Sequence, residues 1–446
     1  MTPPRAVNVA DLVEQGRVGR GQVGAFAVLC AALVLDGFDV QVLGYAAPAL
    51  IEAWGIPKTD LAPVFGAGLF GLFLGSILGG MAADRWGRRP VLLAATALFA
   101  VFTLAAAQAG SLRELLGLRL LSGLGLGAIM PNATALTGEY SPRRRRVATM
   151  MIVTNGFLVG AMLAGFLAAW LIPLAGWRAL FLVGGVAPLL LLLPMAVLLP
   201  ESLQFLALRG GRPERIARWL RLVGAAAPAG EEVRYLAEEA PRQGLPLAQL
   251  FRGGRAPGTL LLWAVNFLNV LNAYFIASWL PTLVREAGHP TSTAVLVGTA
   301  VQAGGAIGTV VLGFVMQRTG FVKVLTACFA VAAANLALIG QPGLPPWALV
   351  AVAFLLGWGI FGGQPGVNAL AATWYPTDLR TTGLGAALGV GRFGAILGPL
   401  LAGALMLREW TTQELFQAAA VPAAVAAALV FATRWVIETP RPGGGP

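Results

Sequence analysis

Apolar stretches of about 20 residues recur along nearly the whole chain, and each is long enough to cross a hydrocarbon core of about 30 Å as a helix. Hydrophobic residues make up 57% of the 446 residues and charged residues only 11%, whereas soluble chains average roughly 45–50% and 25%. A soluble protein has no use for so many apolar stretches. The sequence therefore predicts an all-α integral membrane protein that crosses the bilayer many times.

Twelve spans can be delimited between charged breaks and Pro/Gly-marked breaks. They cover residues 22–46, 63–82, 90–108, 113–137, 147–171, 177–199, 259–283, 293–316, 322–340, 347–371, 382–407 and 415–435. The long polar insert 200–258 follows the sixth span and separates an N-terminal six-helix half, 1–199, from a C-terminal six-helix half, 259–446. Within this cytoplasmic linker, residues 213–222 have the pattern of an amphipathic helix that lies at the inner membrane surface, and a simple tether between the two halves is the favoured role.

The basic residues are distributed unequally between the two sides of the membrane. With the N-terminus inside, cytoplasmic segments hold 24 of the 31 Lys and Arg residues and periplasmic loops hold five. This asymmetry follows the positive-inside rule and predicts a multi-pass protein with both termini in the cytoplasm. It also accounts for the net charge of +11 without a nucleic-acid partner. The Arg-rich, Lys-poor composition favours a bacterial inner membrane, and a monomer is expected.

The two halves repeat each other at a nearly constant offset. At an offset of 235 the repeated residues are Gly127 and Gly362, Tyr140 and Tyr375, Arg145 and Arg380, and Gly156 and Gly391. At an offset of 233 they are Gly80 and Gly313, Arg85 and Arg318, and Gly87 and Gly320. This repetition predicts two pseudo-symmetric six-helix bundles, with a substrate site near the bilayer midplane between them.

The loop between the second and third spans carries a specific pattern of glycines and charges. Its members are Gly80, Asp84, Arg85, Gly87, Arg88 and Arg89. They resemble the signature loop of the major facilitator superfamily, Gly-x3-Asp-Arg-x-Gly-Arg-Arg. The resemblance implies a gate on the cytoplasmic side, in which glycine allows two helices to approach closely. Glu139 and Arg380, together with Asp84, either belong to this gate or are ordinary solvated charges.

Further elements narrow the resemblance to one branch of that superfamily. They are Asp36-Gly-Phe-Asp39 in the first span, Pro200-Glu201-Ser202 after the sixth span, and the stretch from Gly391 to Pro399 in the eleventh span. These elements resemble the aromatic acid/proton symporters. The resemblance implies alternating-access uptake of a small aromatic carboxylate, such as a hydroxybenzoate, in symport with protons.

Charges inside the spans are costly and are therefore candidates for function. Asp36 and Asp39 share a face of the first helix, and Asp36 and Arg119 both lie about 21 Å above the cytoplasmic edge of the membrane. Two carboxylates so close together in a low dielectric cannot both ionise cheaply, so one of them is a candidate proton carrier. The alternative is a structural Asp–Arg pair that clamps the first and fourth helices. The single histidine, His289, falls in a predicted periplasmic loop, which leaves the proton to a carboxylate.

Arg392 lies near the midplane of the eleventh span, and the second half has no acidic residue at a similar depth. A guanidinium there suits a substrate carboxylate, although bonding to helix carbonyls is the alternative. Arg119 is a second candidate for the carboxylate. The remaining candidate substrate residues are Asn269, Asn272, Tyr274, Gln302 and Trp358. Polar groups with aromatic walls suit a planar acid, and interhelical hydrogen bonding explains each amide equally well.

Two other transport functions fit the same fold. A drug/proton antiporter is disfavoured because the fifth span lacks the Gly-Pro ending that is typical of antiporters. An uncoupled sugar or polyol facilitator does not require the two intramembrane aspartates. The sequence shows no metal-ligand cluster, nucleophile–base pair or nucleotide-binding loop. No enzymatic activity, metal or cofactor is expected.

Overall fold

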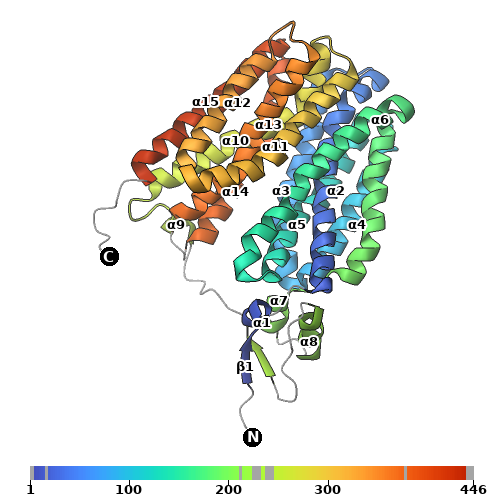
Figure 1. Ribbon diagram of the computed structural model, residues 1–446. Coiled ribbons are helices and arrows are strands. Elements are labelled where there is room, and N and C mark those ends of the chain that lie inside the picture. Colours follow the sequence, from blue (N-terminus) through green and yellow to red (C-terminus); the bar gives the residue numbers. More distant parts are fainter. Residues whose placement is uncertain are drawn as a thin grey trace. The chain divides into compact units, whose positions relative to one another are not determined.

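The computed structural model describes residues 5–15, 19–209, 213–222, 233–236, 246–375 and 379–437 (Figure 1). Eleven helices in this part of the chain are long and apolar enough to cross a membrane. One of them, α6 (Arg143–Leu198), contains two spans, because the chain turns at Gly176 with a φ of 74° that favours glycine. The described helices therefore confirm the predicted twelve-span architecture.

Each predicted span lies on one of these helices, which mostly extend beyond the apolar stretch. The first six spans correspond to α2 (Arg20–Trp54), α3 (Ala62–Trp86) after the 3-10 turn η1 (Lys58–Leu61), α4 (Arg88–Ala106), α5 (Leu112–Glu139) and α6. The last six correspond to α10 (Ala256–Glu286), α11 (Thr291–Thr319), α12 (Phe321–Ile339), α13 (Pro346–Trp374), α14 (Arg380–Met406) and α15 (Thr412–Ile437). Hydropathy locates the apolar part of each span, whereas the helical hydrogen bonds continue past it into the polar ends.

Short elements outside the spans were only partly predicted. They are β1 (Arg5–Asn8), α1 (Val9–Gln15), α7 (Leu203–Leu208), α8 (Pro213–Leu222), β2 (Val233–Leu236) and α9 (Pro246–Gln249). The strands β1 and β2 pair in parallel, which the sequence did not predict. Helix α8 has the predicted bounds, but its apolar residues Ile216 and Leu220 are buried in a protein core. These residues are therefore covered by protein and not by the membrane surface that the pattern predicted.

By internal contacts the chain forms two compact units. The first unit contains Met1–Val40, Ala67–Gly160 and Phe181–Arg242, and the second contains Gln41–Gly66, Ala161–Leu180 and Gln243–Pro446. The second unit thus combines the last six spans with the C-terminal part of α2 and the middle of α6. Within it, Gly44 brings α2 against α10, because a Cβ at this glycine would lie 2.2 Å from the Ala277 carbonyl oxygen.

One pair of glycines that repeats between the halves, Gly127 and Gly362, lies at equivalent helix crossings. In the first unit, Gly127 of α5 packs so closely on α3 that an added Cβ would lie 2.1 Å from the Leu72 carbonyl oxygen. In the second unit, Gly362 of α13 meets Gly308 of α11, with 3.0 Å between the position of an added Cβ and the Gly308 Cα. The offset of 235 in the sequence therefore corresponds to the same backbone-to-backbone contact in both repeats.

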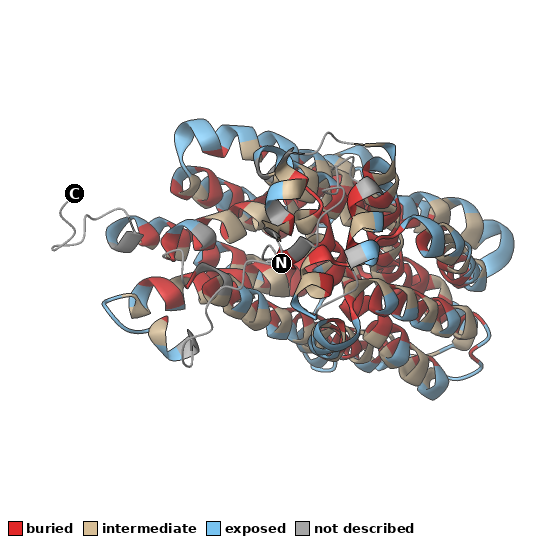
Figure 2. Ribbon diagram, turned by 90° about the horizontal axis from the view of Figure 1, so that it is seen from below, coloured by how far each residue is buried: buried red, intermediate tan, exposed pale blue. Residues whose placement is uncertain are grey.

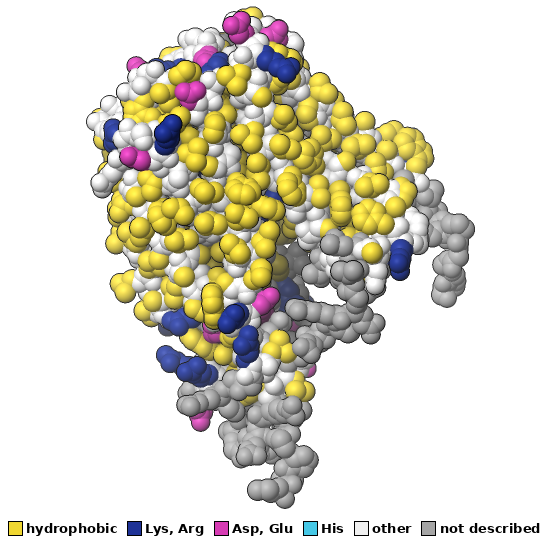
Figure 3. Space-filling view, turned by 180° about the vertical axis from the view of Figure 1, so that it is seen from behind, with side chains coloured by type: hydrophobic (Ala, Val, Ile, Leu, Met, Phe, Trp, Pro, Cys, Tyr) yellow, Lys and Arg dark blue, Asp and Glu magenta, His cyan; other side chains and the backbone are white. Residues whose placement is uncertain are grey.

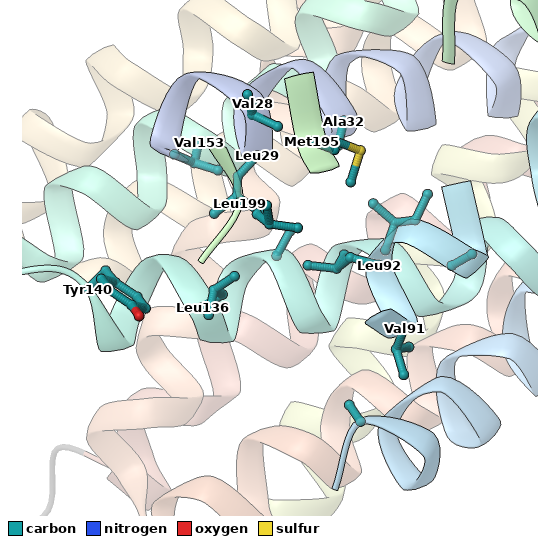
Figure 4. Close-up of a cluster of buried hydrophobic side chains, with 14 of the residues drawn as sticks. Val28, Leu29, Ala32, Val91, Leu92, Leu136, Tyr140, Val153, Met195 and Leu199 are labelled. Carbon is teal, nitrogen blue, oxygen red and sulfur yellow. The ribbon is translucent and has the colours of Figure 1, made fainter. Parts of the chain in front are cut away.

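The helix faces that meet other helices are buried, as the red stretches of Figure 2 show. In the first unit, Leu29, Leu92, Leu136 and Met195 from four different helices form one buried hydrophobic cluster (Figure 4). The surface between the charged helix ends is largely hydrophobic (Figure 3). Large side chains that are more than half exposed on α6 include Trp170, Leu174, Leu190, Leu193 and Val197. This exposed apolar surface is what a lipid-facing helix requires.

Candidate functional site

A charged cluster made of Asp39, Thr103 and Arg119 lies inside the first unit. The Arg119 guanidinium donates from Nη1 to Asp39 Oδ2 at 2.9 Å and from Nη2 to the Asp39 backbone carbonyl at 3.1 Å. The Thr103 hydroxyl donates to Asp39 Oδ1 at 2.7 Å. Asp39 is 0% exposed and Arg119 5% exposed. The structure therefore brings together one predicted acid, the predicted arginine and a threonine that the sequence did not single out.

This ion pair links α2 to α5, as the clamp interpretation of the sequence requires. Removing one partner of a buried ion pair leaves an uncompensated charge and costs about 3–5 kcal/mol. Arg119 also lies over the Phe181 ring, with 5.9 Å between its guanidinium carbon and the ring centroid. In this conformation Arg119 is committed to Asp39. Asp36, one turn before Asp39 on the same helix, is buried as well, at 2% exposed.

The glycine between the two aspartates holds this part of α2 against α6. A Cβ at Gly37 would lie 1.9 Å from the Phe157 carbonyl oxygen, and one at Gly160 would lie 1.8 Å from the Val34 carbonyl oxygen. Only glycine allows backbones to come this close. The Asp36-Gly-Phe-Asp39 element therefore combines buried acids with a tight helix crossing that fixes their position.

A second polar cluster, the amide cluster, lies in the second unit and consists of Asn266, Asn269, Gln364 and Asn368. Asn269 Nδ2 donates to Gln364 Oε1 at 2.6 Å and to the Ile360 carbonyl at 3.1 Å. Gln364 Nε2 donates to Asn266 Oδ1 at 2.7 Å and to Asn368 Oδ1 at 3.3 Å.

Asn266 Nδ2 donates in turn to the Ala387 carbonyl of α14, so the amide cluster joins α10, α13 and α14. Of these residues only Asn269 was a candidate from the sequence, and Gln364 and Asn368 were missed. The signal for both was an amide inside the predicted tenth span, where polar side chains are uncommon.

Several predicted substrate residues of the second unit have polar atoms without a partner in the described part of the chain. Asn272 is 1% exposed, and neither its Oδ1 nor its Nδ2 is hydrogen-bonded to a described residue. The same holds for Oε1 of the buried Gln302. Arg392 of α14 is half-buried and forms no ion pair with a described residue. Tyr274 and Trp358 are half-buried, on α10 and α13.

The signature loop is built around two acids of the first unit. Glu139 forms an ion pair with Arg88 and accepts a hydrogen bond from Ser202 Oγ at 2.6 Å. Glu201 Oε1 accepts from the backbone N–H groups of Arg88, at 2.8 Å, and Arg89, at 3.2 Å. Glu201 thereby places negative charge at the N-terminus of α4, where the free N–H groups and the helix dipole favour it. Glu201 belongs to the Pro200-Glu201-Ser202 element, for which the sequence indicated a family resemblance but no role.

Tyr140 directly follows Glu139 at the end of α5 and contacts Glu201. Its hydroxyl donates to the Glu201 backbone carbonyl at 2.6 Å, and Gln22 donates to the Tyr140 carbonyl. Burial, together with the charges of Glu139 and Glu201, raises the pKa of the Tyr140 phenol well above its usual value. The phenol therefore remains a neutral hydrogen-bond donor.

The other predicted gate residues differ in their surroundings. Gly87 adopts a φ of 98°, and a Cβ there would lie 2.4 Å from the Glu201 carboxylate. Gly80 has open space where a Cβ would project, and the close approach expected at Gly80 is made by Gly79 against Ala128. Asp84 and Arg85 are exposed. The side chain of Arg380 lies outside the described residues. Of the expected Asp84–Glu139–Arg380 network, the structure therefore shows only Glu139, with Arg88 and Ser202 as its partners.

Two exposed ion pairs lie in the second unit, at the end of α10. Arg285 pairs with Glu52 at 2.5 Å and donates to the Pro48 carbonyl at 2.9 Å. Lys58 pairs with Glu286 at 2.6 Å. These four charged side chains line an open cavity of about 520 Å³. They connect the end of α2 and the η1 turn to α10.

Twelve membrane-spanning helices in two repeats, with charged and amide groups buried inside them, define a secondary transporter. The sequence profile of the Major Facilitator Superfamily matches residues 29–234 and 262–446. The chain belongs to this superfamily and is a transporter, not an enzyme. The resemblance inferred from the signature loop is thereby confirmed.

Named relatives and solved structures agree with this assignment. The chain is 40% identical to a gallate transporter of Pseudomonas putida over 96% of its length and 95% of the relative's. It is 39% identical to the 4-hydroxybenzoate transporter PcaK of Pseudomonas aeruginosa over 91% of both chains. The fold is similar to that of the xylose transporter XylE from E. coli in a partially occluded, inward-open conformation, with a TM-score of 0.71. That match covers 95% of this chain and 99% of the other, at 16% identity, so it supports the fold alone.

Proposed function

We propose that the protein takes up a small aromatic carboxylate, such as a hydroxybenzoate, together with protons. The environment of Arg392 is the main support for an anionic aromatic substrate. Arg392 is a half-buried residue of a membrane-spanning helix, and its guanidinium forms no ion pair with a described residue. A cation in that position favours an anionic ligand, because a carboxylate that leaves water needs a compensating charge. Relatives named as transporters of gallate and of 4-hydroxybenzoate support an aromatic acid.

In this proposal the substrate binds to the second unit by several types of contact. The planar Arg392 fork binds the carboxylate through two charge-assisted hydrogen bonds. Asn272 and Gln302 supply polar atoms that have no partner among the described residues. Tyr274 and Trp358 provide aromatic surface for a planar ring. Asn269 holds its place within the amide cluster and supports the wall of the site.

Proton coupling is assigned to the buried acids of the first unit. When Asp39 is ionised, its hydrogen-bonded ion pair with Arg119 holds α2 to α5. Protonation of Asp39 removes the Coulombic attraction and leaves a neutral acid beside the guanidinium. A two-state structure can use such a local charge change to shift its conformational equilibrium. Asp36 is the second candidate proton carrier. Arg119 becomes available to a carboxylate only when Asp39 releases it.

The signature loop is proposed as the gate on the cytoplasmic side. Its arginines face the side that holds most of the basic residues, which fits a protein of the bacterial inner membrane with both termini in the cytoplasm. Arg88 and Arg89 are held by Glu139 and Glu201, whereas Asp84 is exposed. Asp84 is the exposed acid of the loop and can therefore change partners during transport.

Uptake into cells that express the protein tests the function as a whole. The substrates are radiolabelled 4-hydroxybenzoate, gallate, xylose and a lipophilic cationic drug, each measured with and without a protonophore. The proposal predicts accumulation of the aromatic acids above the level of cells without the protein, and loss of accumulation with the protonophore. Accumulation that persists with the protonophore would remove proton coupling. Selective uptake of xylose would favour the sugar facilitator, and proton-dependent export of the drug would favour the antiporter.

A further inference from the structure

The hydrogen bonds of the amide cluster fix the orientation of each carboxamide. Asn266 Nδ2 and Asn269 Nδ2 each donate to a backbone carbonyl, at Ala387 and Ile360. A carbonyl can only accept, so neither asparagine can exchange its nitrogen and oxygen without placing two acceptors together. Asn266 therefore presents Oδ1 to Gln364, and Asn269 presents Nδ2 to it.

Gln364 is fixed by these two neighbours. Its Oε1 must face Asn269 and its Nε2 must face Asn266, as the contacts at 2.6 and 2.7 Å show. The second hydrogen of Nε2 is directed to Asn368 Oδ1 at 3.3 Å. Both hydrogens of the Gln364 amide are thus used and its oxygen accepts one hydrogen bond, and the backbone carbonyls of two helices determine its direction.

Asn368 is the open end of this chain of hydrogen bonds. Its Oδ1 accepts from Gln364, so its Nδ2 points away from the cluster. Within the described part of the chain, this Nδ2 donates no hydrogen bond. Asn368 is half-buried, whereas Asn266 and Asn269 are 0% and 2% exposed. The half-buried end of the cluster therefore offers the Asn368 NH2 group as a donor in a defined direction.

We propose that Asn368 recognises an acceptor substituent on the ring of the aromatic acid, and that Gln364 is the positioning residue that keeps the Asn368 amide in its donor orientation. This inference rests on the proposed function and adds the source of its selectivity among ring substituents. A site built to hydrogen-bond a substrate group rejects the analogue that lacks it, because its own polar group is then left unpaired. The ligand is thus an aromatic carboxylate with an oxygen substituent, of the phenol or aryl ether type.

Four ligands separate the chemistry of this contact. 4-Hydroxybenzoate can both donate and accept, 4-methoxybenzoate can only accept, 4-aminobenzoate mainly donates, and benzoate does neither. The corresponding 3-hydroxy, 3-methoxy and 3-amino benzoates test whether the Asn368 amide contacts ring position 3 instead of position 4. Affinities are measured on the purified full-length protein, and each is expressed relative to benzoate so that effects on the carboxylate cancel.

The wild-type protein is expected to bind the hydroxy and methoxy acids about tenfold more tightly than benzoate, the effect of roughly one hydrogen bond. 4-Aminobenzoate, which mainly donates, should bind no better than benzoate. Asn368→Leu, or Asn368→Ala should the leucine variant fail to fold, should bring all four within about twofold. Gln364→Leu keeps the Asn368 amide but frees its direction, so the preference for methoxy over amino should disappear while 4-hydroxybenzoate still binds better than benzoate.

Asn335→Leu on α12 is the matched control, because Asn335 donates to the Val331 carbonyl of its own helix. It should leave the order of the four ligands unchanged. Equal losses for all four ligands in Asn368→Leu would overturn the assignment of Asn368, and a retained methoxy preference in Gln364→Leu would overturn the positioning role. If the wild-type protein binds none of the acids, the proposed function itself fails, a result that is distinct from both.

Discussion

The two buried polar clusters hold their helices together by different chemistry. Asp39, Thr103 and Arg119 in the first unit form a charged cluster in which the carboxylate and the guanidinium satisfy each other. The amide cluster of the second unit is neutral and is oriented by two backbone carbonyls. A single proton changes the charge of the first cluster and leaves the second unchanged at ordinary pH, because carboxamides do not titrate there. In the function proposed above, proton coupling therefore belongs to the first unit and ligand recognition to the second.

The largest effect is expected from Asp39→Asn. The variant keeps the side-chain shape but cannot take up and release a proton, so proton-driven accumulation should fall to the level of vesicles without protein. Exchange of labelled for unlabelled substrate across reconstituted vesicles should survive better, since it needs no net proton movement. Asp36→Asn is tested in parallel, because either acid can be the carrier.

Asp60→Asn is the matched control, since Asp60 is an exposed acid in the η1 turn. It should leave accumulation and exchange unchanged. Persistent accumulation in both Asp39→Asn and Asp36→Asn would break the assignment of coupling to the first unit.

Arg392→Gln should have the next largest effect, confined to ligands with a carboxylate. Hydrogen bonds to a charged group contribute about 1.5–3 kcal/mol, so binding of 4-hydroxybenzoate should weaken about 10- to 150-fold. Arg392→Lys should lose less, because it keeps the charge and loses only the planar fork. Binding of the neutral analogue 4-hydroxybenzamide should change by less than about threefold. Equal losses for acid and amide would make Arg392 structural and would transfer the carboxylate to Arg119.

Asp84→Asn is expected to alter the conformational equilibrium more than ligand binding. The change removes a charge from an exposed position of the signature loop. Labelling of cysteines placed at either end of the helices should change about two- to fivefold, which corresponds to a shift of roughly 0.4–1 kcal/mol. The ligand order should stay that of the wild type. A changed ligand order with unchanged labelling would count against a gating role.

The smallest effect is expected at the exposed pair Glu52–Arg285. Exposed ion pairs contribute about 0–1 kcal/mol, unlike the buried pair of the charged cluster. Arg285→Glu alone should change transport by less than about fivefold, and combining it with Glu52→Arg should restore the rate. A loss of transport as large as that of Asp39→Asn would show that the exposed pair matters as much for transport as the buried one.

The sequence predicted the fold in detail and the site in part. Twelve spans and their repeat could be predicted because hydropathy and glycine spacing act locally along the chain. A pair between the first helix and Arg119 could be anticipated from the equal depth of Asp36 and Arg119, but the structure forms it with Asp39, one turn further along the helix. Thr103 could not be anticipated, because a threonine in a span usually bonds to its own helix.

Other features depend on contacts that one sequence does not encode locally. Gly79, and not Gly80, makes the close approach to Ala128, since helix rotation decides which of two adjacent glycines faces the neighbour. Gln364 joins Asn266 and Asn269 from a helix almost 100 residues further along the chain. Glu201 lies next to α4 only after the chain has folded.

Proton movement during substrate flux tests the central claim most directly. The purified protein is reconstituted into vesicles that contain a pH-sensitive dye, and an inward gradient of 4-hydroxybenzoate is applied in weak buffer. After subtraction of the signal from vesicles without protein, the account predicts acidification of the interior that follows substrate uptake and is lost in Asp39→Asn. Substrate uptake by the wild-type protein without protein-dependent acidification would contradict proton coupling through the charged cluster.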